Sequence, residues 1–171
     1  MRAAARQLDI VVRAGLAWRA TMDTKATIRG FCRSNLDALL RLYRHLHERD
    51  EAPPPRAELE RIWNGLVDDV QQLYLGAFVG EQLVSACNAA IVPNLTRGAR
   101  PYAVVQNVVT DPQHRRRGIG SATLEALIGR CRARRCYKIM WMSATGRDSA
   151  HAFYTRIGFD PDAKQAFVYK P

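Results

Sequence analysis

Residues 104–121 read VVQNVVTDPQHRRRGIGS, and the rest of the chain is organised around this stretch. It opens as a β-branched, mostly apolar run, which predicts a buried strand. Asp111-Pro112 ends that strand, because proline has no N–H to donate to a sheet. Beyond the arginines, apolar residues recur at the spacing of one helical face, at Leu124, Leu127, Ile128 and Cys131. The stretch therefore predicts a strand, a basic loop and a helix in succession.

The loop between this strand and this helix has the features of an anion site. The first N–H groups of a helix have no acceptor inside the helix, and the helix dipole makes that end partially positive. Gly118 and Gly120 carry no Cβ, so a phosphate can approach the backbone closely. Three arginines at 115–117 add charge and forked donors. A capped helix start with a solvated basic tip is the alternative, but the flanking strand and helix favour a phosphate site.

The loop is not a P-loop, which needs Gly-Lys-Ser/Thr, nor the dinucleotide fingerprint, which needs a third glycine. Its pattern Arg-x-x-Gly-x-Gly, at Arg115, Gly118 and Gly120, resembles the acyl-coenzyme A pyrophosphate loop of the GNAT N-acetyltransferase superfamily. Residues 150–159, AHAFYTRIGF, are similar to a second segment of that family, Ala-x-x-Phe/Leu-Tyr-x-x-x-Gly-Phe. The resemblance extends from Thr27 to the C-terminus, and two motifs in the right order are more specific than one.

The resemblance implies a fold and a co-substrate. The fold is mixed α/β, with a central, mostly antiparallel sheet flanked by about four helices. In the family, the strand before the loop and the strand after its helix splay apart to hold coenzyme A, here Tyr102–Thr110 and Cys136–Met142. The implied co-substrate is acetyl-CoA, with no metal, in a domain spanning 25–171. The residues implied to bind it are Val108, Val109, Arg115, Arg116, Arg117, Gly118, Ile119, Gly120, Ser121 and Phe153.

Hydrophobic periodicity and turn residues predict the remaining elements. Before the central strand we expect a strand at 26–31, a helix from the N-cap Ser34 to about Arg49, a helix over 59–70, strands at 73–79 and 82–92 around Gly80-Glu81, and a loop at 93–100. After it we expect a helix at 148–157 capped by Gly158, and two last strands at Phe159 and 166–169.

The net charge of +10 is concentrated in two regions: +5 over residues 1–33 and +7 over residues 113–138. Such an excess attracts polyanions, either coenzyme A or nucleic acid. Residues 1–24 read as a basic extension outside the domain, either an amphipathic or transit-like segment or an extension upstream of the second methionine, Met22. Because no interleaved aromatic residues or known binding motif accompany the charge, nucleic acid is the weaker alternative.

Composition places the chain among soluble, single-domain proteins of the cytoplasm. The 171 residues are 47% hydrophobic, yet no run approaches the ~20 apolar residues of a membrane span. Cys87 and Cys131 fall in apolar patterns, so we expect buried thiols, which suit a reducing compartment. The cysteines and histidines lack zinc spacing, so no metal is expected. A homodimer is a further expectation.

Tyr154 matches the position where many members of the family carry the general acid for the leaving thiolate. A phenol with a pKa of about 10 is protonated at neutral pH and can donate a proton. Packing is the alternative, since Phe153 beside it is a core candidate. The resemblance thus nominates Tyr154 as the catalytic residue.

The general base is missing from the pattern. Several relatives place a glutamate in the central strand where this chain has Gln106, and a glutamine cannot accept a proton at ordinary pH. Arg147 likewise replaces an asparagine that is common in the family. With glutamine at 106, either water or the carboxylate of another residue must deprotonate the amine. The alternative is that the domain has weak catalytic activity and serves to sense acetyl-CoA.

The acceptor is expected to be the primary amine of a small molecule, bound between the N-terminal helices and the central strand. Gln106, Arg97 and Arg100 are candidate acceptor-binding residues. Because arginine forks bind carboxylates and phosphates, the two arginines suggest an anionic group beside the amine. Solvated loop arginines are the alternative.

Overall fold

The computed structural model of the chain describes residues 26–46 and 50–169. The predictions for residues 1–24 and for the helix end at Arg49 lie outside these ranges. The strands are β1 (Ala26–Gly30), β2 (Gln72–Val79), β3 (Gln82–Val92), β4 (Tyr102–Thr110) and β5 (Ile139–Trp141). The helices are α1 (Leu36–Tyr43), α2 (Arg56–Asp68), the short α3 (Thr96–Ala99), α4 (Ile119–Ala133) and α5 (Asp148–Ile157), with 3-10 turns at Arg33–Asn35 and Pro112–His114.

The strands form one open sheet in the order β1-β2-β3-β4-β5. The first four strands are antiparallel to their neighbours, and β5 runs parallel to β4. Gly80-Glu81 forms the predicted turn between β2 and β3, and Gly80 has the positive φ of 58° that such a turn requires. The predicted mixed, mostly antiparallel sheet is confirmed.

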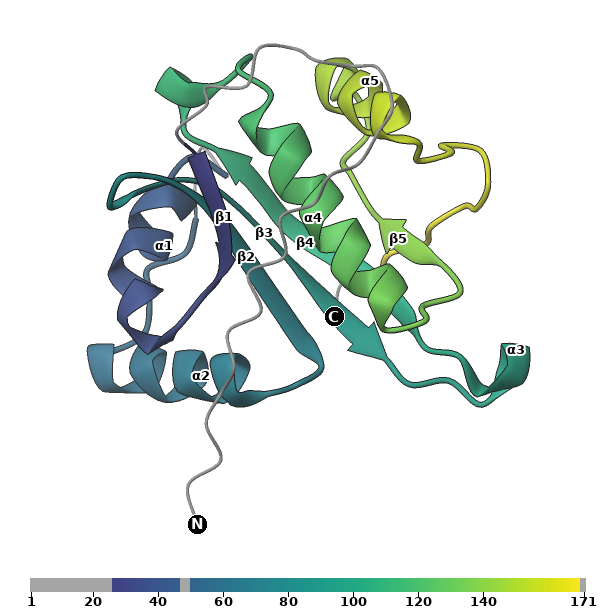
Figure 1. Ribbon diagram of the computed structural model, residues 1–171, viewed down its shortest axis with the longest axis horizontal. Helices are drawn as coiled ribbons and strands as arrows, with labels where there is room; N and C mark the ends of the chain where they lie inside the picture. The colour runs from purple at the N-terminus through teal and green to yellow at the C-terminus, as the bar shows by residue number, and fades with distance from the viewer. Residues whose placement is uncertain (1–25, 47–49, 170–171) are drawn as a thin grey trace.

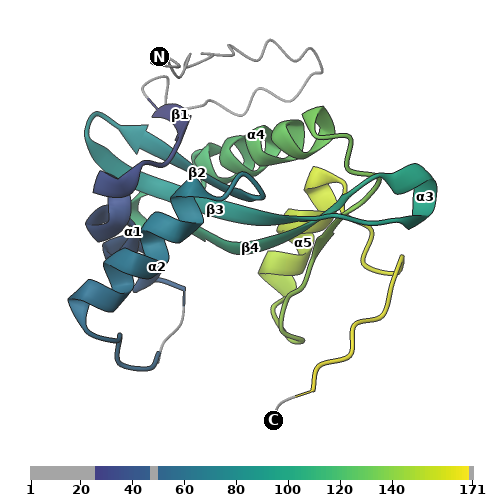
Figure 2. The same cartoon turned by 90° about the horizontal axis from the view of Figure 1, so that it is seen from below.

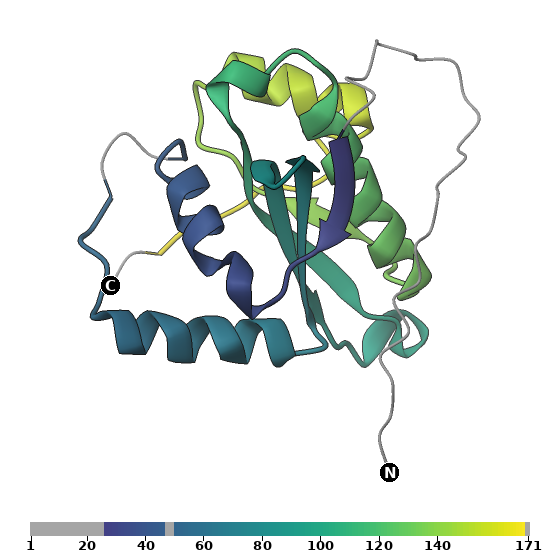
Figure 3. The ribbon, with the colours of Figure 1, turned by 60° about the vertical axis from the view of Figure 1, so that its left-hand side comes forward.

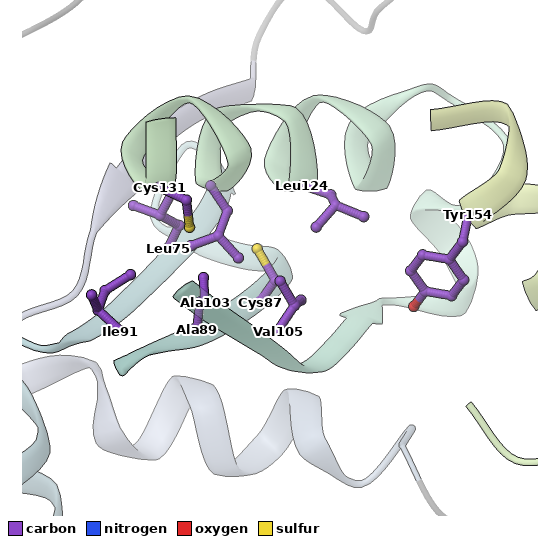
Figure 4. Packing of buried hydrophobic residues seen from close by; sticks show 10 residues of the cluster. Leu75, Cys87, Ala89, Ile91, Ala103, Val105, Leu124, Cys131 and Tyr154 are labelled. Atoms are coloured by element: carbon purple, nitrogen blue, oxygen red, sulfur yellow. The ribbon is translucent and has the colours of Figure 1, made fainter. Parts of the chain in front are cut away.

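Helices cover both faces of this sheet (Figures 1 and 2). The helix α4 packs on one face, where Leu124 and Leu127 join Cys87 and Val105 in a buried cluster. Figure 4 shows part of that cluster, with Tyr154 projecting from α5 at its end. On the other face, α1 and α2 pack through a cluster that includes Leu39 and Trp63, and Figure 3 shows these two helices and α4 on opposite sides of the strands.

Two irregularities in β4 shape the region where it leaves the sheet core. Only Ala103, Val104 and Val105 pair with β5, so the two strands diverge after Val105, as Figure 1 shows. On the β3 side, Ala86 pairs with Val109 and Asn88 pairs with Gln106, which places two residues of β4 opposite one of β3. This is a β-bulge, and its Asn107 has a left-handed φ of 51°.

The two predicted C-terminal strands are wrong. Residues 158–169 form no strand, and Phe167, Val168 and Tyr169 are 87%, 76% and 88% exposed. These residues have high β propensity, but propensity alone does not make a strand without a neighbour to pack against. Asp160, Pro161 and Asp162 precede them and form a turn, in which Asp160 accepts a hydrogen bond from the N–H of Asp162 at 2.9 Å.

The strand predicted at Cys136–Met142 is shorter than expected. The Cys136 N–H donates to the Cys131 carbonyl at 3.1 Å, and the Tyr137 N–H to the Pro101 carbonyl at 2.9 Å. These residues therefore satisfy their backbone at the end of α4 and in the loop before β4, and the ladder begins only at Ile139.

The first helix also starts differently from the prediction. Ser34 lies inside a 3-10 turn instead of capping the helix, and the residue before α1 is Asn35. The Asn35 side chain accepts the Cys32 N–H at 2.9 Å, so it satisfies the turn at its start. Gly158 ends α5 with a left-handed φ of 105°, as predicted.

Gly76 tests the packing between β1, β2 and β3. A Cβ at this position would collide with the Phe31 ring and lie 2.6 Å from Leu83 Cδ1. We expect Gly76→Ala to destabilise the protein by roughly 1–3 kcal/mol, as overpacked cores do, in thermal or urea unfolding. Gly129→Ala, on the exposed face of α4 with nothing within 4 Å, is the control and should stabilise it by roughly 0.5–1 kcal/mol. Equal stability of the two variants would contradict this packing.

Candidate functional site

The basic loop has a defined backbone. Arg116 and Gly118 have positive φ values of 60° and 75°, and α4 begins immediately afterwards. The loop is tied to the end of β4, because the Arg115 Nε donates to the Thr110 carbonyl at 3.0 Å. Asp111 holds the turn before it by accepting the Gln113 N–H at 2.8 Å. Left-handed residues in such a turn direct successive N–H groups toward one side, which is the geometry of an anion-binding nest.

The start of α4 adds further donors to this loop. At the start of α4, the Ala122 N–H donates a hydrogen bond to the Gly118 carbonyl at 3.0 Å. The N–H groups of Ile119, Gly120 and Ser121 precede it and have no acceptor within the helix. The side chain of Ile119 is 2% exposed and packs with Ala77 and Val84, so only its backbone can contact a ligand. Arginines 115–117 are exposed around these donors.

Gly120 has a structural role that the motif alone does not reveal. A Cβ there would lie 2.8 Å from the Thr110 hydroxyl oxygen. That oxygen shares a hydrogen bond with the Ser85 hydroxyl at 2.9 Å, and Ser85 donates to the Val109 carbonyl at 3.0 Å. The missing side chain at 120 therefore lets α4 approach the end of β4.

Tyr154 lies beside the point where β4 and β5 diverge. Its ring stacks on Trp141, the last β5 residue paired with β4, with 3.4 Å between ring centroids. Phe153 and Phe159 approach it edge-on, at 5.0 and 6.0 Å between centroids. Burial raises the pKa of the Tyr154 phenol well above its usual value, although Arg147 partly offsets this. The phenol is consequently protonated throughout the neutral range.

Gln106 lies in a row of polar side chains that crosses the sheet. It pairs with Asn88 of β3, which pairs in turn with Tyr74 of β2. Directly paired residues on neighbouring strands project from the same face of a sheet. The ring of Tyr74 contacts that of Trp63 in α2 edge-on, at 5.2 Å between centroids, and both belong to the cluster under α1 and α2. The row therefore faces α1 and α2. Val108 packs with the α4-side core and Val109 with the α1-side core, so these two can meet a ligand mainly through their backbone.

Sequence reasoning missed two polar residues in this region. The Tyr43 hydroxyl and the Asn88 Oδ1 are both buried and have no hydrogen-bond partner in the described structure. An unsatisfied buried polar atom costs about 1–3 kcal/mol, so such atoms need an explanation. An asparagine inside the apolar run VSACNAAIV of β3 was the available signal, whereas Tyr43 looks like an ordinary core residue in the sequence.

Arg97 and Arg100 are not brought to this region. Arg97 lies within α3 and Arg100 directly follows it, at the end of β4 opposite to the start of α4 (Figure 1). Gln106 lies six positions after Arg100 along an extended chain, which corresponds to about 20 Å. The Arg100 Nε donates to the Arg97 carbonyl at 3.1 Å and braces the turn itself. These two arginines are therefore distant from the loop, Tyr154 and Gln106.

The basic segment 113–138 is divided in the same way. Arginines 115–117 lie at the N-terminus of α4, whereas Arg130, Arg132, Arg134, Arg135 and Lys138 lie at or beyond its C-terminal end. A helix of 15 residues is about 22 Å long. Only the first group can contribute charge to the anion site.

Other features give the site no further ligands. Cys87 and Cys131 are buried, as predicted. Within 26–46 and 50–169, no group of three or more His, Cys, Asp or Glu side chains could hold a metal ion, and no helix is long and apolar enough to cross a membrane. Two shallow hollows, of about 160 and 230 Å³, are lined by neither Tyr154 nor Gln106. We therefore locate the candidate site at the backbone donors of the loop and the diverging strands, and not at these hollows.

Known proteins are similar to this chain in sequence. The chain is 31% identical over 84 residues to a glucosamine 6-phosphate N-acetyltransferase of Trypanosoma brucei brucei, covering 49% of this chain and 55% of that protein. The match thus spans about half the length of this curated relative.

Solved structures resemble the whole fold. A structure from Agrobacterium tumefaciens str. C58, provisionally assigned as an acetyltransferase, has a TM-score of 0.79 and 30% identity, covering 85% of this chain and 99% of that one. An acetyltransferase of Trypanosoma brucei has a TM-score of 0.72 and 25% identity with the same coverage. The model of the acetyltransferase (GNAT) family matches residues 36–159, which include both β4 with its basic loop and α5 with Tyr154, and the chain belongs to this family.

Proposed function

We propose that this protein is an acetyl-CoA-dependent N-acetyltransferase that transfers the acetyl group directly from the thioester to the primary amine of a small molecule. The observation that carries the proposal is the combination of an N–H-rich helix start, an unpaired stretch of β4 and a buried phenol around one strand divergence. Family membership supports acetyl-CoA as the co-substrate.

The residues present suit coenzyme A. Backbone N–H groups of residues 116–121 would bind the pyrophosphate, and arginines 115–117 would balance its charge. The edge of β4 from Gln106 to Val108 has no β5 partner in the described structure, so its outward backbone groups are free to pair with the amides of the pantetheine arm. Phe153 lies 4.0 Å from the position of a Cβ on Gly120, which places an apolar ring beside the helix start.

Two proton transfers accompany such a reaction. The attacking amine must lose a proton, and the leaving thiolate, with a pKa of roughly 8.5, is helped by a donor. Tyr154 is positioned to be that donor, since its raised pKa keeps the proton on the phenol. The row facing α1 and α2 consists of Tyr74, Asn88 and Gln106 and includes no carboxylate, so we assign amine deprotonation to water.

The acceptor class follows from the relatives and from this neutral row. The curated relative acts on glucosamine 6-phosphate, and we propose an amino-sugar-like amine for this chain. Arg97 and Arg100, at the other end of β4, play no part in that proposal. The homodimer and the cytoplasmic location stay predictions.

An acetyl-CoA sensor without turnover is the second candidate, and Gln106 in place of a carboxylate is the observation that favours it. Turnover of acetyl-CoA on a panel of amines separates the two functions. Transfer to any amine above the rate of spontaneous hydrolysis supports the enzyme, whereas tight binding without transfer supports the sensor.

The glycines of the loop provide the binding test. Gly118→Val places a branched Cβ at a φ of 75°, where it is strained and blocks phosphate. We expect acetyl-CoA affinity, measured by calorimetry, to fall by more than about ten-fold, since the variant loses preorganised N–H donors. Gly129→Ala lies in the same helix and should bind like the wild type. Unchanged affinity in a folded Gly118→Val protein would remove the loop from the site.

Tyr154→Phe tests the proton donor. The substitution keeps the ring that stacks on Trp141 and removes the hydroxyl. General acid help is worth about 10²- to 10⁴-fold, so kcat should fall by around that factor while acetyl-CoA affinity changes little. Full kcat in Tyr154→Phe would mean that the tyrosine only packs the core.

The absence of a carboxylate at 106 should appear in the pH–rate profile. With water as the base, kcat/KM should rise with pH as the free amine fraction grows, up to the pKa of the acceptor, which the hydroxyl-bearing carbons of an amino sugar hold below the value of about 10 for a simple alkylamine. The raised pKa of Tyr154 predicts no loss of its proton over that range. We expect Gln106→Glu to increase the rate near pH 7 and to flatten the rise. A wild-type profile that is already flat from pH 6 to 9 would instead reveal an internal base.

A further inference from the structure

Asn88 is the most deeply buried polar side chain near the β4 bulge without full hydrogen bonding. It is 3% exposed, and its Oδ1 has no partner in the described structure. It lies in the middle of β3, directly opposite Gln106. A buried acceptor without a donor points to a ligand or a water that completes it.

The Tyr43 hydroxyl is a second atom of this kind. It is also buried without a partner, at the end of α1. Burial raises the pKa of this phenol, Tyr74 raises it further, and Asn107 partly offsets the effect. Asn107 is therefore close to the hydroxyl, although the two groups do not reach hydrogen-bonding geometry. The hydroxyl lies beside the bulged residue of β4.

These two unsatisfied atoms lie in one neighbourhood. Tyr43 is near Tyr74 and Asn107, Tyr74 pairs with Asn88, and Asn88 pairs with Gln106. The buried thiol of Cys87 is close enough to influence both Tyr43 and Tyr154. Tyr154 and Cys87 pack on the α4 face of the sheet and Tyr43 on the α1 face, so the two phenols lie on opposite sides of the same part of β3.

The groups that shift the pKa of Tyr43 carry no charge at neutral pH. The groups that act on Tyr43 are another phenol, an amide and a thiol whose own pKa is raised by burial. Neutral donors and acceptors of this kind complement hydroxyl and amine hydrogens, whereas a carboxylate or phosphate would require a cation or several N–H groups.

We propose that the Tyr43 hydroxyl and the Asn88 Oδ1 are specificity-determining groups that hydrogen-bond the ring hydroxyls of a polyhydroxylated amine acceptor. The inference rests on the proposed acetyl transfer and names the chemistry by which that site selects its acceptor. Asn88 accepts a hydrogen from one hydroxyl, and Tyr43 donates to another. In the complex each of these atoms gains a hydrogen-bond partner that the protein itself does not supply.

The test compares one polyol amine with one bare ring amine. Glucosamine and cyclohexylamine are the two acceptors, and the proteins are the wild type, Tyr43→Phe, Asn88→Leu and the control Tyr102→Phe at the far end of β4. For Tyr43→Phe we expect kcat/KM on glucosamine to fall about ten-fold or more, with less than about two-fold change on cyclohexylamine. Asn88→Leu should do the same, and Tyr102→Phe should change neither.

Stability distinguishes recognition from structure. Because no described protein group hydrogen-bonds the Tyr43 hydroxyl, Tyr43→Phe should leave the melting temperature unchanged or raise it. A fall of several degrees, or an equal loss of rate on both amines, would overturn the proposal. Tyr43→Phe decides the outcome if Asn88→Leu does not fold.

Binding separates this inference from the proposed reaction. With coenzyme A present, glucosamine should raise the melting temperature of the wild type and not of Tyr43→Phe. If that shift is found without any acetyl transfer, the recognition holds and the proposed transfer fails. If glucosamine is neither acetylated nor able to stabilise the wild type, the recognition is overturned, whatever other amines are acetylated.

Discussion

The left-handed backbone of Asn107 is the constraint on which the site depends. One extra residue in β4 shifts the alternation of the strand, so that Gln106 faces α1 and α2, Val108 packs toward α4 and Val109 again faces α1. An asparagine tolerates positive φ better than most residues, so this conformation costs little. The bulge coincides with the divergence from β5, and a strand edge is therefore free where chemistry can occur.

The rest of the site is held relative to that edge by short, specific contacts. Thr110 and Ser85 fix the end of β4, and Arg115 fixes the loop to it. Gly120 allows α4 to lie against the same threonine. On the other side of the divergence, Trp141 holds Tyr154 by stacking. The helix start proposed to bind the pyrophosphate and the phenol proposed as proton donor are thus anchored independently at the two sides of one gap.

Local chemistry predicted much of this from the sequence, because proline, glycine and arginine act through their immediate neighbours. The loop, α4, α5 and the Gly80 turn depend on such signals, and the structure contains them. The polar row depends on pairing between distant strands, and the Tyr43 hydroxyl depends on how α1 packs, so neither was visible. The distance of Arg97 and Arg100 from Gln106 and Tyr154 was not visible either, because closeness in sequence to β4 does not say which end of the strand is near.

Amide hydrogen exchange with and without acetyl-CoA tests the central claim most directly, because it reports on individual segments of one folded protein. We predict that acetyl-CoA slows amide hydrogen exchange at residues 116–121 and 106–109. Exchange at residues 97–100 and at the C-terminal end of α4 should not change. Protection at α3 or at 130–138, with none at 116–121, would contradict the claim that the start of α4 and the diverging edge of β4 form the acetyl-CoA site.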